Sequence, residues 1–354
     1  MARIVSRRSK ISYNRCMRTG SRHIATLAAS LLLLVAAAST RADEPPSGAL
    51  GRTMADATSS ATRAGWVKYD HNPVLGGKLG TCFDMAVLKE DFAFRMWFSW
   101  RSKKSIALVE SQDGYHWSDP QIVLGPTSSG WEDEVNRPAI LKRTDGYHLW
   151  YTGQAKGHSW IGHATSPDGK AWTRASDKPV LFPDAKWEKV AVMCPDVAWD
   201  AGVKRFRMWY SGGEQYEPDA IGYATSSDGN LWTKSAGNPV FTADAKSDWE
   251  RHKVTACQVL KHGDWFYMFY IGFRDVDHAQ IGLARSRDGI SNWKRHPNNP
   301  IVVPTPGGWD QDAVYKPAVI FDGQRWLVWY NGRHGGMEQI GVATHAGEDL
   351  GFPR

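Results

Sequence analysis

Four stretches of the chain end in nearly the same way: Ser111-Gln-Asp-Gly-Tyr-His-Trp117, Ser166-Pro-Asp-Gly-Lys-Ala-Trp172, Ser226-Ser-Asp-Gly-Asn-Leu-Trp232 and Ser286-Arg-Asp-Gly-Ile-Ser-Asn-Trp293. Their final tryptophans lie 55, 60 and 61 residues apart. An Asp-Gly pair between two apolar runs is a strong signal for a tight turn between antiparallel strands. The recurrence of this turn predicts a structural repeat of about 60 residues, and such a repeat constrains the architecture more than any local feature.

Short apolar runs precede each turn at matching distances. The run next to the turn covers residues 106–110, 161–165, 221–225 and 281–285, and an aromatic run before it covers 95–100, 149–152, 208–211, 268–271 and 328–331. A further run covers 84–88, 137–141, 194–198, 256–260 and 316–320. With the segment after the turn, each repeat is predicted to be a four-stranded antiparallel unit, and the aromatic and first runs occur five times.

The fifth copy stops after its third run, at residues 340–344, and its missing fourth segment occurs at the front of the chain. Residues 65–75 match the segments that follow the turns, at 172–181, 232–241 and 293–302. A first strand that completes the last unit would close a ring and leave no long free sheet edge. The sequence therefore predicts an all-β fold, a five-bladed β-propeller with the N-terminal strand closing the last blade.

The N-terminus has the pattern of a targeting segment. Residues 1–42 combine scattered Arg and Lys, the apolar run 24–38 and a small-residue Thr40-Arg41-Ala42 sequence suited to cleavage. We expect a cleaved signal peptide at 1–42, a linker at 43–64 and a catalytic propeller domain at 65–354, and hence a secreted or periplasmic protein. The alternative is an uncleaved N-terminal anchor, although the apolar run is short for a membrane span.

The charge balance gives no reason to expect a nucleic-acid partner. The whole chain has 43 Lys and Arg against 37 Asp and Glu, but eight of the basic residues and none of the acidic ones lie in residues 1–42. The remaining chain is slightly acidic, so its surface lacks the basic excess that nucleic acid requires. Cys82, Cys194 and Cys257 match no zinc spacing, and we expect buried thiols without a disulfide, and no metal or cofactor.

Candidate site residues come from the first strand of each unit, which lines the central channel of a propeller. The opening position holds Asp84, Arg137, Cys194, Ala256 and Lys316, and the position two residues later holds Ala86, Ala139, Asp196, Gln258 and Ala318. Packing in a repeat requires similar residues in each copy, so unlike charges at equivalent positions indicate a site. If strand alternation holds, both positions face the channel and their charged residues converge at one end.

Loops at the same end supply further candidates. Cleavage of a glycosidic bond needs one carboxyl group that protonates the leaving oxygen and another that activates water or attacks the anomeric carbon. We expect Asp84 to be the base or nucleophile, kept ionised by Arg137 or Lys316, Asp196 to position substrate, and Glu214 to be the acid, with Glu134, Asp312 and Glu338 as the next choices. The residues expected to bind substrate are Arg137, Lys316, Gln258, Arg101, Arg274, Arg333, Trp100 and Tyr216.

With five predicted blades and an aspartate on the first inner strand, residues 65–349 resemble the five-bladed glycosidase superfamily that includes glycoside hydrolase families 43, 32 and 130. The resemblance to family 43 implies a base at Asp84 and a second aspartate in a Pro-Asp motif, matched by Pro195-Asp196. It also implies a glutamate about sixty residues later, where this chain reads Val254-Thr-Ala-Cys-Gln258 and has no acid.

The predicted function is therefore a glycoside hydrolase that cleaves a furanoside or a plant or algal glycan at the mouth of the channel. Two alternatives stay open at this point. Basic residues near the mouth, among them Arg137 and Lys316, could hold phosphate for a glycoside phosphorylase, as a faint similarity of residues 131–137 to the family 130 phosphorylases implies. The chain could also be a non-catalytic carbohydrate-binding propeller. The sequence does not predict an oligomeric state.

Overall fold

The computed structural model describes residues 62–216 and 218–353. The predicted signal peptide and nearly all of the predicted linker lie outside the described residues. The described residues belong to one compact unit, Ala55–Arg354. They form β-strands joined by turns, with three short 3₁₀ helices at Gly77–Leu79, Arg101–Lys103 and Lys186–Glu188. No helix in this part of the chain is long and apolar enough to cross a membrane.

The strands fall into five consecutive antiparallel sets, numbered here one to five. Set one is β2 (Cys82–Glu90), β3 (Ala93–Trp100), β4 (Ser105–Ser111) and β5 (Gln121–Leu124); set two is β6 (Glu134–Arg143), β7 (Gly146–Ala155), β8 (His158–Ser166) and β9 (Thr173–Arg174). Set three is β10 (Ala191–Asp200), β11 (Arg205–Gly213), β12 (Pro218–Ser226) and β13 (Trp232–Lys234); set four is β14 (Lys253–His262), β15 (Trp265–Phe273), β16 (Ala279–Ser286) and β17 (Lys294–Arg295). Set five is β18 (Ala313–Phe321), β19 (Arg325–His334), β20 (Met337–Ala346) and, from the start of the chain, β1 (Trp66–Lys68).

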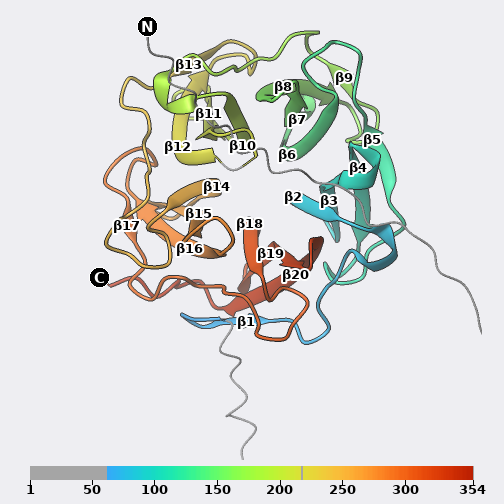
Figure 1. The fold of residues 1–354 in the computed structure, drawn as a ribbon. Coiled ribbons are helices and arrows are strands. Elements are labelled where there is room, and N and C mark those ends of the chain that lie inside the picture. The colour runs from blue at the N-terminus through green and yellow to red at the C-terminus, as the bar shows by residue number, and fades with distance from the viewer. Residues whose placement is uncertain (1–61, 217, 354) are drawn as a thin grey trace, which may run out of the picture. The chain divides into compact units, whose positions relative to one another are not determined.

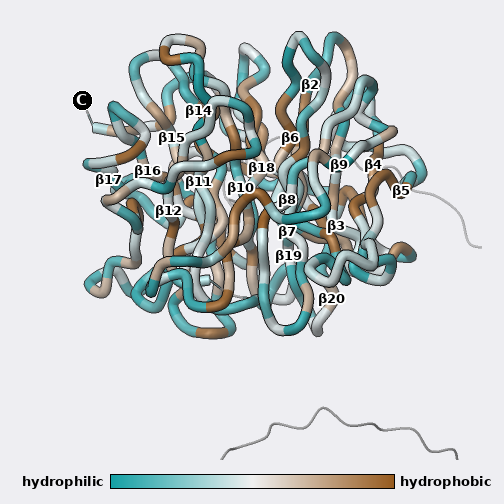
Figure 2. Tube along the Cα trace, turned by 90° about the horizontal axis from the view of Figure 1, so that it is seen from above, coloured by the Kyte–Doolittle hydropathy of each residue, from teal (hydrophilic) through white to brown (hydrophobic). Residues whose placement is uncertain are grey.

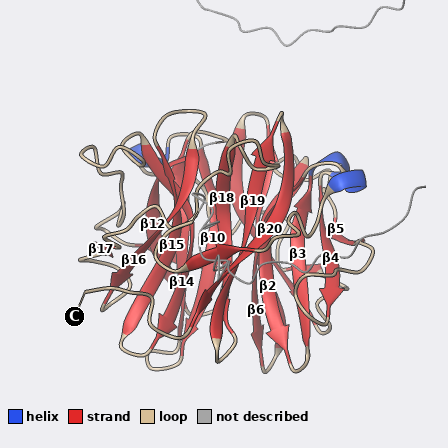
Figure 3. Cartoon of the chain, turned by 90° about the horizontal axis from the view of Figure 1, so that it is seen from below, coloured by secondary structure: helices blue, strands red, loops and turns tan. Residues whose placement is uncertain are grey.

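The sets surround a common centre, with β2, β6, β10, β14 and β18 closest to it (Figure 1). A single parallel pair, Ala191 with Ser159, joins sets two and three into one eight-stranded sheet. The strands run between two opposite faces that carry the turns (Figure 3). Apolar residues follow the strands between these faces, whereas many of the turns are hydrophilic (Figure 2). The core therefore consists of the facing surfaces of neighbouring sets.

The displaced first strand pairs where the sequence predicted. Trp66, Val67 and Lys68 pair with His345, Thr344 and Ala343 of β20, and an isolated bridge joins Leu75 to Ile340. The Lys68 ammonium lies 2.6 Å from the buried Asp310 carboxylate. This ion pair connects β1 to the segment before β18, so residues from the two ends of the described chain complete set five together.

A tryptophan–acid pair before the first strand is a structural feature common to sets two to five. The acid forms an ion pair with a cation on the fourth strand of its own set, in the pairs Glu132–Arg174, Glu188–Lys234, Glu250–Arg295 and Asp310–Lys68. Three of these acids also accept a hydrogen bond from a tyrosine hydroxyl of the second strand: Tyr151, Tyr210 and Tyr330. The four acids are buried and each is paired with a cation, so their role is to hold each set together.

The tryptophan of each pair packs against a glycine of the second strand. A Cβ added at Gly153 would lie 2.3 Å from the Trp131 ring, and Gly272 and Gly332 have the same relation to Trp249 and Trp309. Set one has no such pair, and Trp100 occupies the strand position that Gly153 holds in set two. The Trp100 indole donates to the Leu79 carbonyl at 2.8 Å. Trp100 therefore has a packing role in the set that lacks a tryptophan–acid pair.

The Asp-Gly turns also bind the sets to each other. A tryptophan indole on the second strand of one set donates to the glycine carbonyl in the turn of the next, in the pairs Trp97–Gly169, Trp150–Gly229, Trp209–Gly289 and Trp329–Gly114. The last pair runs from set five to set one. The repeated geometry of the turn thus contributes to packing between sets. The aspartate of each turn accepts hydrogen bonds from backbone amides of the same turn, as Asp113 does from the Tyr115 and His116 amides.

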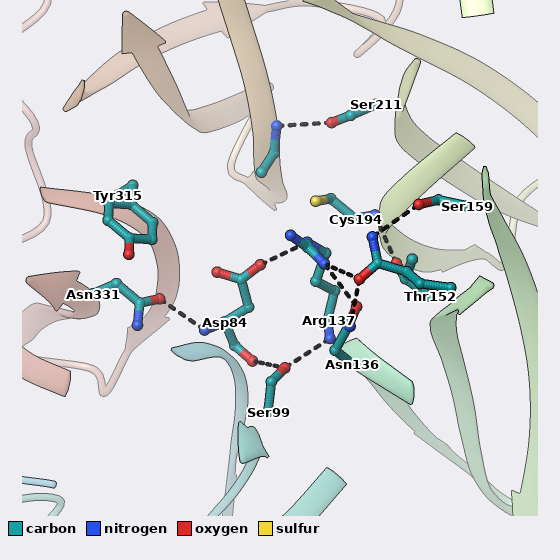
Figure 4. A network of polar contacts seen from close by, with 12 residues as sticks. Asp84, Ser99, Asn136, Arg137, Thr152, Ser159, Cys194, Ser211, Tyr315 and Asn331 are labelled. Carbon is teal, nitrogen blue, oxygen red and sulfur yellow. Dashed lines mark hydrogen bonds and ion pairs between the residues drawn. The ribbon is translucent and has the colours of Figure 1, made fainter. Parts of the chain in front are cut away.

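Every first strand has a β-bulge at its third or fourth residue, where the sequence pattern placed the start of the strand. Residues Asp84, Arg137, Cys194, Ala256 and Lys316 all have a positive φ, between 35° and 54°, and the pairing register of each first strand shifts around them. A bulge inserts an extra residue, disrupts the strand alternation and redirects a side chain. In four of the five cases the backbone amide of this residue donates to a side chain of the preceding set: Asn331, Ser99, Thr152 and Ser211 (Figure 4).

Candidate functional site

The bulges open into a pocket at one end of the central space, with a volume of about 230 Å³. Its charged and phenolic lining residues are Asp84, Arg101, Arg137, Tyr216, Tyr315, Arg333 and Glu338, and Cys194, Ala256 and Phe83 form part of its wall. We call it the bulge pocket. Of the predicted site residues it brings together Asp84, Arg137, Arg101, Arg333 and Tyr216.

Asp84 and Arg137 form the deepest charged pair of the bulge pocket. Arg137 Nε lies 3.1 Å from Asp84 Oδ2, and both side chains are buried. The Ser99 hydroxyl links their backbones, because it donates to the Asp84 carbonyl at 3.1 Å and accepts from the Arg137 amide at 2.8 Å (Figure 4). The Asp84 amide donates to Asn331 Oδ1 at 2.8 Å. Asp84 is therefore fixed from three sets and can change its direction little.

Glu338 supplies the second carboxylate of the bulge pocket. It stands near the start of β20 and its Oε2 accepts two hydrogen bonds from Arg101, at 2.6 and 3.1 Å. Its Oε1 accepts a hydrogen bond from the hydroxyl of the half-buried Tyr315. Only 12% of the Glu338 side chain is exposed, so its orientation is set by these two partners. Sequence reasoning had placed Glu338 only among the further choices for the acid.

The surroundings of Asp84 affect its proton affinity in opposite directions. Burial raises the pKa of the Asp84 carboxyl, while the charges of Arg137 and Lys316 lower it and the charge of Glu338 raises it further. The net direction is upward. The expectation that neighbouring cations keep Asp84 ionised is therefore met only in part, because they oppose the effect of burial without outweighing it.

Three predicted site residues line a different pocket. Asp196, Gln258 and Lys316 face a space of about 330 Å³ bordered by the later residues of the first strands, and Asp84 and Arg137 do not line it. Burial raises the pKa of Asp196 to about 6, and its Oδ2 accepts the Val259 amide at 2.8 Å. Gln258 exchanges hydrogen bonds with the Val319 backbone.

The bulges explain why Asp196 and Gln258 are separated from Asp84 and Arg137; Lys316 is itself a bulge residue, so this reason does not apply to it. The prediction of one shared site assumed regular alternation, in which the opening position and the position two residues later share a face. The extra residue at each bulge breaks that relation. Pro138, Pro195 and Pro317 directly follow a bulge residue, and proline within a sheet is confined to edges and bulges. These prolines were the sequence signal that would have revealed the irregularity.

Glu214, Arg274 and Trp100 line neither pocket. Glu214 is 62% exposed and its carboxylate lies 3.1 Å from the Lys189 ammonium, so the structure does not bring it to Asp84. Arg274 pairs with the neighbouring Asp275 at 3.2 Å. Cys82, Cys194 and Cys257 are buried and unbridged, and only Cys194 lines the bulge pocket.

Comparison with known proteins supplies independent information about the chain. A sequence model described as "Glycosyl hydrolases family 43" matches residues 71–346. "Beta-fructofuranosidase 1" of Zea mays is 25% identical over 240 residues, which make up 62% of this chain. The chain spans only 32% of the length of that maize protein.

Solved structures share the fold at lower identity. One is titled "Crystal Structure of Exo-1,5-alpha-L-arabinanase from Bovine Ruminal Metagenomic Library", with a TM-score of 0.60, 15% identity, and coverage of 78% of this chain and 98% of that one. Another is titled "The GH130 family of mannoside phosphorylases contains glycoside hydrolases that target beta-1,2 mannosidic linkages in Candida mannan", with a TM-score of 0.59, 17% identity, and coverage of 77% and 87%.

Proposed function

The chain belongs to glycosyl hydrolases family 43, and from that premise we propose that it cleaves a glycosidic bond in the bulge pocket with Asp84 and Glu338. The predicted resemblance to the propeller glycosidases is confirmed, and so is the predicted class of enzyme, a glycoside hydrolase that acts on glycans. One observation supports the location most strongly. Among the residues that line the bulge pocket, Asp84 and Glu338 are the two with carboxyl groups.

The roles follow from hydrolytic chemistry. One carboxyl group donates a proton to the departing oxygen as the bond from the anomeric carbon breaks, and the other receives a proton from the attacking water or attacks the carbon itself. Overall, water contributes a hydroxyl group to the anomeric carbon and a proton to the leaving group, and both carboxyl groups return to their starting protonation states. We assign the base or nucleophile to Asp84, as the family resemblance implies, and the acid to Glu338 in place of Glu214.

Arg137 and Tyr315 act on these two groups. Arg137 fixes the direction of the Asp84 carboxylate through its 3.1 Å ion pair. The Tyr315 hydroxyl holds Glu338, and burial raises the pKa of Tyr315 well above its ordinary value, so the phenol keeps its proton for that hydrogen bond. Tyr216 is 68% exposed at the rim and offers a flat surface to a sugar ring.

We further infer that the five strand sets are the blades of a closed five-bladed propeller, with β1 as the outer strand of the last blade. Two hydrogen bonds support this inference, one donated by the Asp84 amide to Asn331 and one donated by the Trp329 indole to the Gly114 carbonyl. They join set five to set one in the way that other neighbouring sets are joined. The Lys68–Asp310 pair supports the assignment of β1. Closure of the ring would explain how the bulge residues of four separate sets, Asp84, Arg137, Cys194 and Ala256, meet in one pocket.

The substrate class and the location of the protein are also proposals. We propose a furanoside or another plant or algal glycan as the substrate; the names of the maize fructofuranosidase and the ruminal arabinanase are in keeping with a furanoside. The basic and apolar residues of the N-terminus support export from the cytoplasm. Mass spectrometry of the exported protein should find an N-terminus near Ala42, and an intact Met1 in the exported material would contradict export with cleavage.

The function is tested by incubating purified protein with arabinan, xylan, fructan, mannan and aryl furanosides, each with and without phosphate. Release of reducing sugar in phosphate-free buffer supports the proposal. Release only with phosphate would instead identify a phosphorylase, which the basic lining of the pocket makes the second candidate. Binding without release by a folded protein would identify a carbohydrate-binding propeller.

A further inference from the structure

The bulge pocket contains more positive than negative charge. Its lining residues include three arginines and two carboxylates. Arg137 is paired with Asp84, and Arg101 is paired with Glu338 at 2.6 Å. Among the described residues, the third guanidinium, that of Arg333, has no carboxylate partner.

Arg333 stands directly opposite Glu338 in the ladder between β19 and β20. Residues that pair in this way project to the same face of a sheet. Both Glu338 oxygens are nevertheless occupied, one by Arg101 and one by Tyr315. Glu338 therefore does not serve as the counter-ion of its cross-strand neighbour.

The contacts of Arg333 leave most of its donors unused. Among the residues that the structure describes, no carboxylate lies within ion-pair distance of its guanidinium, and its one hydrogen bond goes to the Asp277 carbonyl at 2.9 Å. The charge of Arg333 contributes to a lowered pKa at Asp312, but the carboxylate of Asp312 contacts His334 and the Gly335 amide. A guanidinium has five N–H donors in a planar fork that suits a carboxylate or another oxyanion.

A second cation strengthens the positive field around Asp84. Lys316 is 4% exposed and forms no ion pair with any described residue, and its charge reaches Asp84 across the central space. A neutral sugar would leave the Arg333 charge of the bulge pocket, which Lys316 does not line, without a counter-ion. A negatively charged ligand would compensate it and would gain from the low dielectric constant of the pocket.

We propose that Arg333 binds an oxyanion carried by the substrate, a carboxylate or sulfate group on the sugar that occupies the bulge pocket. The inference rests on the proposed function, because it places an acidic sugar unit beside Glu338. The natural substrate is then an acidic glycan, such as one containing uronic acids. Inorganic phosphate offers similar oxygen geometry, so the experiment separates an oxyanion on the sugar from a free one.

The test is isothermal titration calorimetry of the intact protein with uronic-acid oligosaccharides and with their carboxyl-reduced counterparts, in which a CH₂OH group replaces the carboxylate. We expect the acidic member of at least one pair to bind about tenfold more tightly than its neutral counterpart, the effect of one charge-assisted hydrogen-bond pair. Arg333→Met should abolish that preference, and Arg333→Lys should retain part of it.

Arg274→Met is the matched control, because Arg274 lies on a nearby loop, is paired with Asp275 and does not line the pocket. It should leave the preference unchanged. Equal binding of acidic and neutral ligands by the wild-type protein, or a preference that survives in a folded Arg333→Met protein, would overturn the proposal. If inorganic phosphate binds in an Arg333-dependent way and the acidic sugars do not, the proposal that the oxyanion is carried by the substrate would also be overturned. Because the test measures binding, its outcome is independent of whether Asp84 and Glu338 perform hydrolysis.

Discussion

Two positions of the repeat have opposite characters. The tryptophan–acid pair before each first strand is nearly the same in sets two to five, and its acid is always buried against a cation of the fourth strand. The bulge residue a few positions later differs in every set: aspartate, arginine, cysteine, alanine and lysine. The backbone conformation at the bulge is repeated although the side chain is not.

The difference separates what the fold requires from what the chemistry requires. A side chain that recurs in each set solves a packing problem that recurs in each set. At the bulges the fold requires only a positive φ, which costs most residues free energy, and the side chain is free to vary with function. A similar variable position lies two residues after the side chain that accepts the bulge amide, which is Ser99 in set one and Asn331 in set five. It holds Arg101, just after β3, and Arg333, within β19. Changes at the two kinds of position should therefore differ in their effects on activity and on stability, and equal effects would contradict this separation.

The largest effect is expected at the variable position of set one. Asp84→Asn should lower kcat/KM by about 10²–10⁴-fold, because an amide cannot accept the proton of the attacking water or attack the anomeric carbon. The melting temperature should fall little, since the amide oxygen can still accept a hydrogen bond from Arg137. Initial rates and thermal unfolding measured on the same preparation check this. A variant that loses its fold together with its activity would place Asp84 among the packing residues.

The repeated position should show the reverse. Lys68→Met leaves Asp310 buried without its cation and should lower the free energy of unfolding by about 3 kcal/mol, the cost of breaking a buried pair. At temperatures where the protein stays folded, kcat/KM should change by less than about twofold, because Lys68 lies away from the bulge pocket. Denaturant titration measures the first quantity and initial rates the second.

Lys104→Met is the matched control for that variant, because the Lys104–Glu134 pair is exposed. Its loss should cost less than about 1 kcal/mol. If the two lysine variants unfold at the same denaturant concentration, the Lys68–Asp310 pair does not stabilise set five, and the proposed closing role of β1 loses its main energetic support.

The parts of the fold and of the site that could be predicted from the sequence are those that follow the regular repeat. The strand sets and the displaced first strand both follow from what repeats. Asp84 and Arg137 were found because they are unlike residues at equivalent positions. Asp196 and Gln258 were assigned to the same site because a bulge adds one residue without leaving a periodic signal, and only Pro195 and its equivalents mark it.

The choice of the acid could not be made from the sequence at all. Glu214 and Glu338 both follow a second strand, and nothing in the repeat says which one reaches the centre. Glu338 does so because β20 begins at Met337 and its ladder with β19 directs the side chain toward Arg101. Glu214 instead pairs with Lys189 at the surface.

A smaller effect is expected on the pH dependence. Burial raises the pKa of Asp84. As the pH falls, Asp84 therefore takes up a proton at a higher pH than an ordinary aspartate does. Activity is lost at that point, because a protonated carboxyl group cannot act as the base. Lys316→Met removes a charge that lowers this pKa, and the acidic limb of kcat/KM should move upward by about one pH unit or less. Rates measured from about pH 4 to 8 would show it. An acidic limb that stays in place or moves downward would mean that the ionisation of Asp84 does not control it.

The central claim is that Asp84 and Glu338 form the hydrolytic pair, and it is tested most directly by comparing Glu338→Gln with Glu214→Gln on one cleavable glycan. Each change removes a carboxylate of a glutamate that follows a second strand, but only Glu338 lines the bulge pocket. Glu338→Gln should lower kcat/KM by about 10²-fold or more, while Glu214→Gln should retain nearly all of it. Full activity in Glu338→Gln together with its loss in Glu214→Gln would contradict the account.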